Sequence, residues 1–257
     1  MPTKFTNVLG VFALLIGASV VHASEGGHAG WEREANNQVT NVASLQRGAR
    51  NFLAYCSGCH SLRFMRYSRL AADLKISDEL RDQYLVKPGA KFTDYIQSPM
   101  PAPDATEWFG KAPPDLSLVA RSRGADWIFN FLTTFYADPA NRQTGVNNLT
   151  LPGTAMPHVL SNLQGVKNAT WTNEEHEGPD GNAVTSKAFA KFEPGIVGSM
   201  TDEQYDGFVR DTVNFLDYVG DPTQVERRGL GIWVVLFLLM FTGIAYMLKT
   251  EYWKDVH

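Results

Sequence analysis

The stretch Cys56-Ser57-Gly58-Cys59-His60 holds the only two cysteines of the chain, and a histidine follows them at once. The spacing C-x-x-C-H is the attachment motif of c-type haem. Two thioether bonds can fasten one edge of a porphyrin, and the adjacent histidine can then place its imidazole on the iron. The sequence therefore predicts one haem c, bound covalently by Cys56 and Cys59, with His60 as an axial ligand.

Three other uses of two cysteines compete with this interpretation. A disulfide is common in exported domains. A redox-active C-x-x-C would follow a strand, and half a zinc site would need a second pair of ligands. The chain has no further cysteine, and the residues before the motif have a helical pattern. We therefore favour haem over the alternatives.

The helix before the motif is predicted from apolar residues on one face, at Leu45, Gly48, Phe52 and Tyr55. Gly48 lets another helix approach closely. A second amphipathic helix runs from Thr201 to Val219, and we expect the two to pack together.

That second helix has clear boundaries. Thr201 and Gln204 form a capping-box pattern at its start, and Gly220 and Pro222 stop it. A shorter helix is expected over Asp126–Tyr136. The remaining long stretches, Val86–Leu116 and Ala137–Gly198, are predicted to be irregular.

The sixth ligand of the iron decides between two chemistries. An open position suits gas binding or peroxide chemistry, whereas a thioether stabilises Fe(II) and suits an electron carrier. Met65 lies too close to His60 in sequence, and Met200 opens a helix. Two methionines in proline-stiffened loops remain, Met100 and Met156, with His158 as a rival ligand.

The residues alone only slightly favour Met156 over Met100. Gly153 and Ala155 are small, so the backbone beside Met156 can approach a porphyrin ring. A stiff loop also holds a weak ligand without an ordering cost.

Two uncharged apolar segments stand outside the haem-binding part. Val8–Val21 follows Lys4 and ends in a small-x-small site, which predicts a signal peptide over residues 1–23. The alternative is a retained N-terminal anchor. Gly229–Leu248 is twenty residues long, enough to cross about 30 Å of hydrocarbon, with a buried core helix as its alternative.

These segments define the expected organisation. Residues 24–227 form a periplasmic haem domain, 229–248 a single transmembrane anchor, and 249–257 a cytoplasmic tail, on a bacterial inner membrane. The exported part carries 25 acidic and 19 basic residues, a formal charge of −6. Such a surface favours a basic partner and argues against nucleic-acid binding. No nucleophile set, phosphate loop or metal cluster predicts a separate catalytic site.

Several ordered stretches resemble the cytochrome c1 family, the haem subunits of ubiquinol–cytochrome c reductase. They are Cys56–Tyr67, Ala112–Leu118, Arg121–Gly124, Pro152–Leu160 and Lys249–Lys254. The similarity runs from about Trp31 to His257. It implies a mainly α fold, a class I cytochrome c-like haem domain with long irregular insertions and one C-terminal transmembrane helix.

The resemblance also implies the site and the partners. His60 and Met156 would be the two iron ligands, Arg123 would lie near a haem propionate, and Pro114 and Trp127 would line the pocket. The chain would take electrons from a Rieske iron–sulfur subunit and pass them to a cytochrome c, beside a cytochrome b subunit, in a dimeric quinol:cytochrome c oxidoreductase of the respiratory chain. A free-standing anchored cytochrome, a haem peroxidase or reductase with an open iron, and a haem sensor are the rival interpretations.

Overall fold

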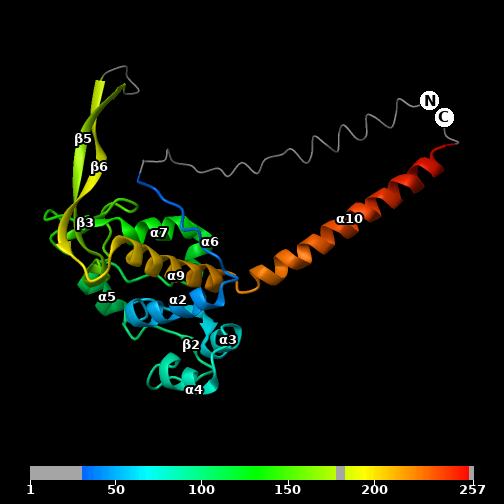
Figure 1. The fold of residues 1–257 in the computed structure, drawn as a ribbon, viewed down its shortest axis with the longest axis horizontal. Coiled ribbons are helices and arrows are strands. Elements are labelled where there is room, and N and C mark those ends of the chain that lie inside the picture. The colour runs from blue at the N-terminus through cyan, green and yellow to red at the C-terminus, as the bar shows by residue number, and fades with distance from the viewer. Residues whose placement is uncertain (1–30, 178–182, 255–257) are drawn as a thin grey trace. The chain divides into compact units, whose positions relative to one another are not determined.

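The computed structural model describes residues 31–177 and 183–254, and this part of the chain is mainly helical (Figure 1). The signal peptide predicted at 1–23 lies outside the described residues. The helices are α2 (Val42–Tyr55), α3 (Tyr67–Asp73), α4 (Asp78–Leu80), a π-helical turn (Arg81–Leu85), α5 (Ala102–Phe109), α6 (Val119–Arg123), α7 (Ala125–Thr133), α8 (Ser161–Gln164), α9 (Asp202–Gly220) and α10 (Gln224–Tyr252). The strands are β1 (Leu62–Arg66), β2 (Tyr95–Ile96), β3 (Phe135–Ala137), β4 (Val146–Asn148), β5 (Gly165–Glu177) and β6 (Ala183–Val197).

Helices α2 and α9 pack side by side and form the centre of the core (Figure 1). Both predicted helices are confirmed, and so is the capping box, in which the Thr201 hydroxyl and the Gln204 side chain each accept from the other residue's backbone N–H. The rings of Phe52 and Phe215 lie 5.8 Å apart between the two helices. Burial of such side chains stabilises the pair by about 1.5–3 kcal/mol for each large apolar residue.

Gly48 lies where α9 approaches α2 closely, as its position predicted. A Cβ atom there would lie 2.6 Å from the Phe215 Cβ and would also overlap the Asp211 carbonyl oxygen. No side chain fits in that space, so glycine at this position sets the distance between α2 and α9.

Helix α7 also packs against α9, and its prediction is confirmed except at its end. The Thr134 hydroxyl donates to the Asn130 carbonyl, and the chain then leaves the helix. Phe135 and Tyr136 belong to β3, because they pair with Asn148 and Asn147 of β4.

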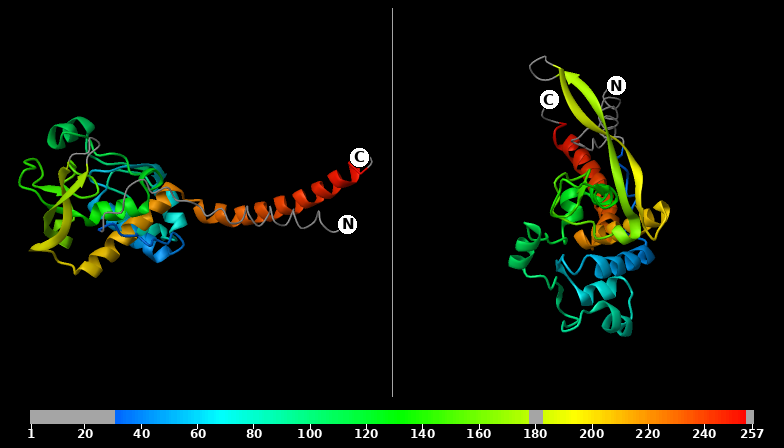
Figure 2. Two further views of the ribbon diagram at one scale, coloured as in Figure 1. Left: turned by 90° about the horizontal axis from the view of Figure 1, so that it is seen from above. Right: turned by 90° about the vertical axis from the view of Figure 1, so that its left-hand side faces the viewer.

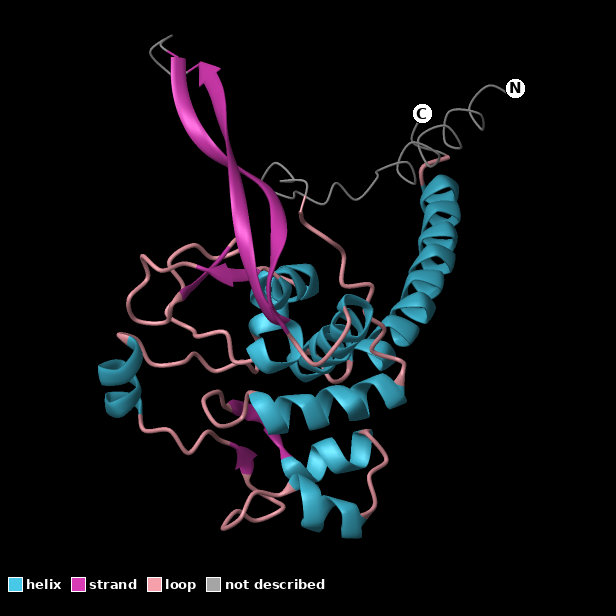
Figure 3. Ribbon diagram, turned by 60° about the vertical axis from the view of Figure 1, so that its left-hand side comes forward, coloured by secondary structure: helices cyan, strands magenta, loops and turns pink. Residues whose placement is uncertain are grey.

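The prediction that Ala137–Gly198 is irregular is wrong for its second half. Strands β5 and β6 form a long antiparallel hairpin whose two strands twist about each other (Figure 3). Gly165 pairs with Val197 at its base, and β5 joins β3 in parallel at Lys167. The four strands have the order β4-β3-β5-β6. The first irregular stretch, Val86–Leu116, contains only β2 and α5.

Helix α10 follows α9 after a three-residue turn (Figure 2). It covers 29 residues, has a mean hydropathy of 2.2 in its most apolar part, and buries none of its described side chains. It is therefore long and apolar enough to cross a membrane, and it extends beyond the predicted 229–248 at both ends. Arg227 near its start pairs with Asp221 at 2.5 Å.

Candidate haem site

The cysteine motif lies directly after α2. The helix ends with the N–H of Cys56 donating to the Phe52 carbonyl, and the chain then folds into a further turn. The amides of Cys59 and His60 both donate to the Cys56 carbonyl, at 3.0 and 2.8 Å. The two cysteines and the histidine are thus held on one compact turn whose position is set by the core helix.

Backbone carbonyls of this turn are bound from outside the motif. The Lys87 ammonium donates to the Ser57 carbonyl at 2.7 Å, and the Ser98 hydroxyl donates to the Gly58 carbonyl at 2.7 Å. Sequence reasoning missed both residues, because they lie about 30 and 40 positions away and belong to no motif.

The cysteine environment does not suit redox chemistry. Both cysteines are free of disulfide bonds in the structure. Burial, and after it the neighbouring Cys59, raises the pKa of the Cys56 thiol to about 12. A redox-active cysteine needs a lowered pKa, since the thiolate is the reactive form. This thiol stays protonated at neutral pH, which argues against a thioredoxin-type role.

His60 is oriented by a hydrogen bond on one side of its ring. Its Nδ1 lies 2.7 Å from the Pro114 carbonyl oxygen. A carbonyl can only accept, so Nδ1 carries the proton and Nε2 keeps its lone pair. Metal-binding histidines are commonly oriented by such a bond on the second nitrogen.

The protonation state of His60 also suits a ligand. Burial lowers the pKa of the imidazole, although the bond to Pro114 and the charge of Asp115 act in the opposite direction. The ring is therefore neutral at pH 7, which is the form that binds a metal.

The segment that carries Pro114 is fastened to the strand after the motif. The Leu116 amide donates to the Ser61 carbonyl at 2.9 Å. The Asp115 carboxylate accepts from the amides of Arg63 and Ser117, at 2.9 and 3.0 Å. These bonds hold the Pro114 carbonyl in place beside His60.

The loop of Met156 is also closely tied to the core. Gly153 has a φ of +74°, and its amide donates to the Asn147 side chain at 2.8 Å. Thr154 is buried, and Met156 is half-buried against the core. The assignment of Met156 as the sixth ligand stays a prediction.

The other candidate ligands have different surroundings. Met65 is 1 % exposed inside the core, and Met200 packs against it. Met100 is half-buried and remains chemically open as an alternative. His158 is 8 % exposed, and its Nε2 donates to the Gly165 carbonyl at 3.1 Å, so that nitrogen is already used.

Arg123 and Trp127 come together as neighbours. The Arg123 guanidinium lies over the Trp127 ring, 5.2 Å from its centroid. Trp127 in turn stacks on Phe131 at 5.3 Å, with the two rings nearly parallel. Trp127 is thus a fixed aromatic surface, and the Arg123 cation stays exposed beside it.

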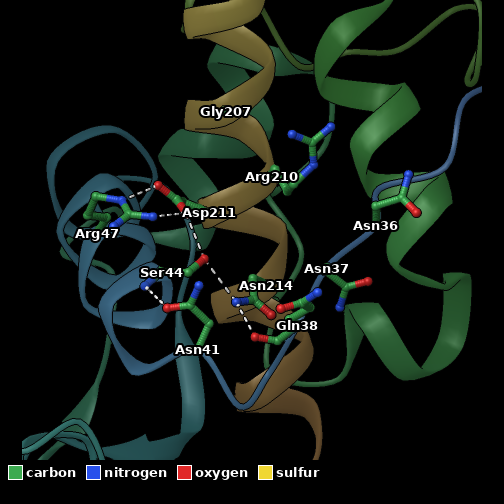
Figure 4. Close-up of a pocket in the computed structure, with 10 residues that line it drawn as sticks. All are labelled: Asn36, Asn37, Gln38, Asn41, Ser44, Arg47, Gly207, Arg210, Asp211 and Asn214. Carbon is green, nitrogen blue, oxygen red and sulfur yellow. Dashed lines mark hydrogen bonds and ion pairs between the residues drawn. The ribbon is translucent and has the colours of Figure 1, made fainter.

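A polar pocket of about 320 Å³ lies elsewhere, between α2, α9 and residues 36–41 (Figure 4). Asp211 binds Arg47 and Ser44 there, and Asn214 donates to Ser44. Ser44 is at the start of α2, whereas the cysteine motif follows its end. This pocket therefore belongs to the helix–helix contact and not to the haem motif.

The residues at the motif fit a c-type haem. They offer two unpaired thiols on one turn and an imidazole whose Nε2 is available to a metal. The described residues contain no group of three or more His, Cys, Asp or Glu side chains that could hold a bare metal ion. A porphyrin-bound iron takes axial ligands from the protein, and the His60 imidazole is such a donor.

Comparison with known proteins gives a family match for most of the chain. The model of the Cytochrome C1 family matches residues 31–175 and 198–256. Cytochrome c1 of Allochromatium vinosum is 44 % identical over 250 residues, 97 % of this chain and 98 % of that protein. The ammonia monooxygenase gamma subunit of Nitrosomonas europaea is 41 % identical over 250 residues, 96 % of this chain and 97 % of that protein. The mitochondrial cytochrome c1 haem protein of Schizosaccharomyces pombe is 28 % identical over 237 residues, 83 % of this chain and 67 % of that protein.

Proposed function

Because the chain belongs to the cytochrome c1 family, we propose that it is the haem-bearing electron carrier of a quinol:cytochrome c oxidoreductase. Members of this family carry a covalently bound haem c and act as electron-transfer subunits of the cytochrome bc complex. The bond between His60 Nδ1 and the Pro114 carbonyl is the observation that carries the proposal, because it prepares an imidazole beside two free thiols to bind iron.

Each site residue has its own role in holding the haem. Cys56 and Cys59 hold one haem c through thioether bonds, and His60 binds the iron through Nε2. Met156 would supply a sulfur ligand to the iron. The haem, when bound, supplies a one-electron Fe(III)/Fe(II) couple. The protein sets its potential through the sulfur ligand, the burial of the site and its hydrogen bonds.

The partners follow from the place of this family in the complex. The chain accepts an electron from a Rieske iron–sulfur subunit and gives it to a cytochrome c, next to a cytochrome b subunit in a dimeric assembly. The formal charge of −6 on residues 24–227 supports a basic electron acceptor, since opposite charges speed encounter.

The membrane arrangement completes the proposal. The chain is a single-pass membrane protein, with α10 as its anchor. We place residues 1–23 in a signal peptide, 24–227 in the periplasm, the span 229–248 in the bacterial inner membrane and the tail 249–257 in the cytoplasm. The C-x-x-C-H motif at residues 56–60 supports this orientation, because haem c is attached outside the bacterial cytoplasm.

Purification of the affinity-tagged, full-length chain from its own membranes in mild detergent tests the proposal. We expect cytochrome b and Rieske subunits to co-purify, and quinol to reduce the haem only when the Rieske subunit is present. A double variant, Cys56→Ala with Cys59→Ala, serves as the control that lacks haem attachment.

Two outcomes contradict the proposal. A haem-loaded chain that purifies alone would indicate a free-standing anchored cytochrome. Co-purification with a membrane monooxygenase would instead favour the role that the name of the Nitrosomonas relative suggests.

A further inference from the structure

His158 lies in a buried aromatic stack two residues after Met156. Its ring stacks on Phe135 with centroids 4.8 Å apart and an angle of 4° between the planes. Phe135 is 1 % exposed and packs edge-on against Phe131 of α7 at 5.2 Å. Since Phe131 stacks on Trp127, the four rings form one continuous series from α7 to the Met156 loop.

The hydrogen bond of His158 ends on a rigid acceptor. Its Nε2 donates to the Gly165 carbonyl, at the base of the β5–β6 hairpin. Gly165 has a φ of +85°, and a Cβ there would lie 2.7 Å from the Gly198 nitrogen. The bond to Gly165 and the stack on Phe135 therefore hold the His158 ring against two strands, β5 and β3.

The chain between Met156 and His158 has little conformational freedom. Pro157 stands between the two residues, and its ring fixes its own φ. On the other side of the loop, the buried Thr154 hydroxyl accepts from the Met156 amide at 3.4 Å. Met156 is therefore held from both sides, by Thr154 before it and by His158 after it. His158 has the larger side chain of the two.

We infer that His158 is a positioning residue that keeps the Met156 sulfur on the haem iron. This inference rests on the proposed function, in which Met156 is the sixth ligand. A thioether is a weak ligand, and a loop that must be ordered at each ligation event loses it easily. The stack on Phe135 and the bond to Gly165 order the loop in advance, so the sulfur stays bound in both oxidation states.

The test uses the haem-loaded, full-length chain in detergent. His158→Ala removes the ring and the donor, and His158→Phe keeps the stack but removes the donor. We expect the parent chain to exclude carbon monoxide. We expect His158→Ala to lose most of the far-red sulfur-to-iron absorption band, to have a lower reduction potential, and to bind carbon monoxide. His158→Phe retains more of the band than His158→Ala does.

Asn214→Ala is the matched control. Asn214 is 1 % exposed and donates to the Gln38 carbonyl and the Ser44 hydroxyl, at the contact of α2 with α9. This variant should lower the thermal unfolding midpoint while leaving the band, the potential and the lack of carbon monoxide binding unchanged.

The outcomes separate this inference from the proposed function. A His158→Ala chain with the parent band and potential overturns the inference, and so does an equal spectral change in Asn214→Ala. If His158→Ala does not accumulate, a parent-like band in both His158→Phe and His158→Gln overturns it as well. Met156→Leu, measured in parallel, addresses the ligand itself, because an unchanged band there overturns the ligand assignment and not the role of His158 alone.

Discussion

The carbonyl oxygen of Pro114 lies 2.7 Å from Nδ1 of His60, although 54 residues separate the two along the chain. The contact assigns the ring proton to Nδ1 and leaves Nε2 with its lone pair. The orientation of the proposed iron ligand is therefore a property of the protein fold itself. It depends on the hydrogen bonds that hold the Pro114 segment against the strand after the motif.

Asp115 should make this arrangement sensitive to acid. Burial raises its pKa, but the hydrogen bonds from Ser117 and Arg63 together outweigh burial and leave it below the usual 3.8. A carboxyl group whose pKa is lower in the folded state than in the unfolded state stabilises the protein at pH values above its unfolded-state pKa. This stabilisation is lost as the pH falls through the folded-state pKa. We expect Asp115→Asn to cost about 1–3 kcal/mol at pH 7 and to remove part of the loss of stability below pH 4.

Thermal unfolding of the haem-loaded chain at pH 7 and pH 3 measures this effect. Glu107→Gln changes an exposed carboxyl on α5 and should unfold like the parent at both pH values. Equal acid sensitivity of Asp115→Asn and the parent chain would contradict the role given to Asp115.

Gly48→Ala should destabilise the core sharply. Its methyl group would overlap the Asp211 carbonyl and lie 2.6 Å from the Phe215 Cβ, so α2 and α9 must move apart. Overpacking of this kind costs about 1–3 kcal/mol. Gly207→Ala on α9 is the matched control, because nothing lies within 4 Å of its new Cβ, and it should stabilise the helix by about 0.5–1 kcal/mol. Denaturant unfolding compares the two, and similar effects from both would show that the helix contact does not limit stability.

Removal of residues 228–257 should release the haem domain from the membrane. The truncated chain loses nearly all of α10, the helix with a mean hydropathy of 2.2. We expect the haem-containing product in the soluble periplasmic fraction, and the full-length chain in the membrane fraction. Retention of the truncated chain in the membrane would instead indicate that residues 8–21 remain as an N-terminal anchor.

Local patterns predicted the parts of the fold that depend on neighbouring residues. The periodicity of α2, the capping box of α9 and the space that Gly48 leaves are all properties of one segment or one face. The hairpin of β5 and β6 was missed, since β5 reads GVKNATWTNEEHE and lacks a regular apolar alternation. Its strands are specified by pairing with each other, which single-segment propensity does not capture.

The site divides in the same way. The motif itself is contiguous, so Cys56, Cys59 and His60 could be named from the sequence. Lys87 and Ser98, which bind the motif turn, come from distant segments that carry no recognisable pattern. The choice between Met100 and Met156 also rests on which distant loop meets the iron, and the residues alone left it open.

The optical spectrum and reduction potential of the full-length chain with Met156→Leu test the central claim most directly. Leucine keeps the volume and removes the sulfur, and Met100→Leu provides the matched control. The account predicts that Met156→Leu loses the far-red band and has a much lower potential, whereas Met100→Leu keeps both. An unchanged spectrum in Met156→Leu, with loss of the band in Met100→Leu, would contradict His60/Met156 ligation.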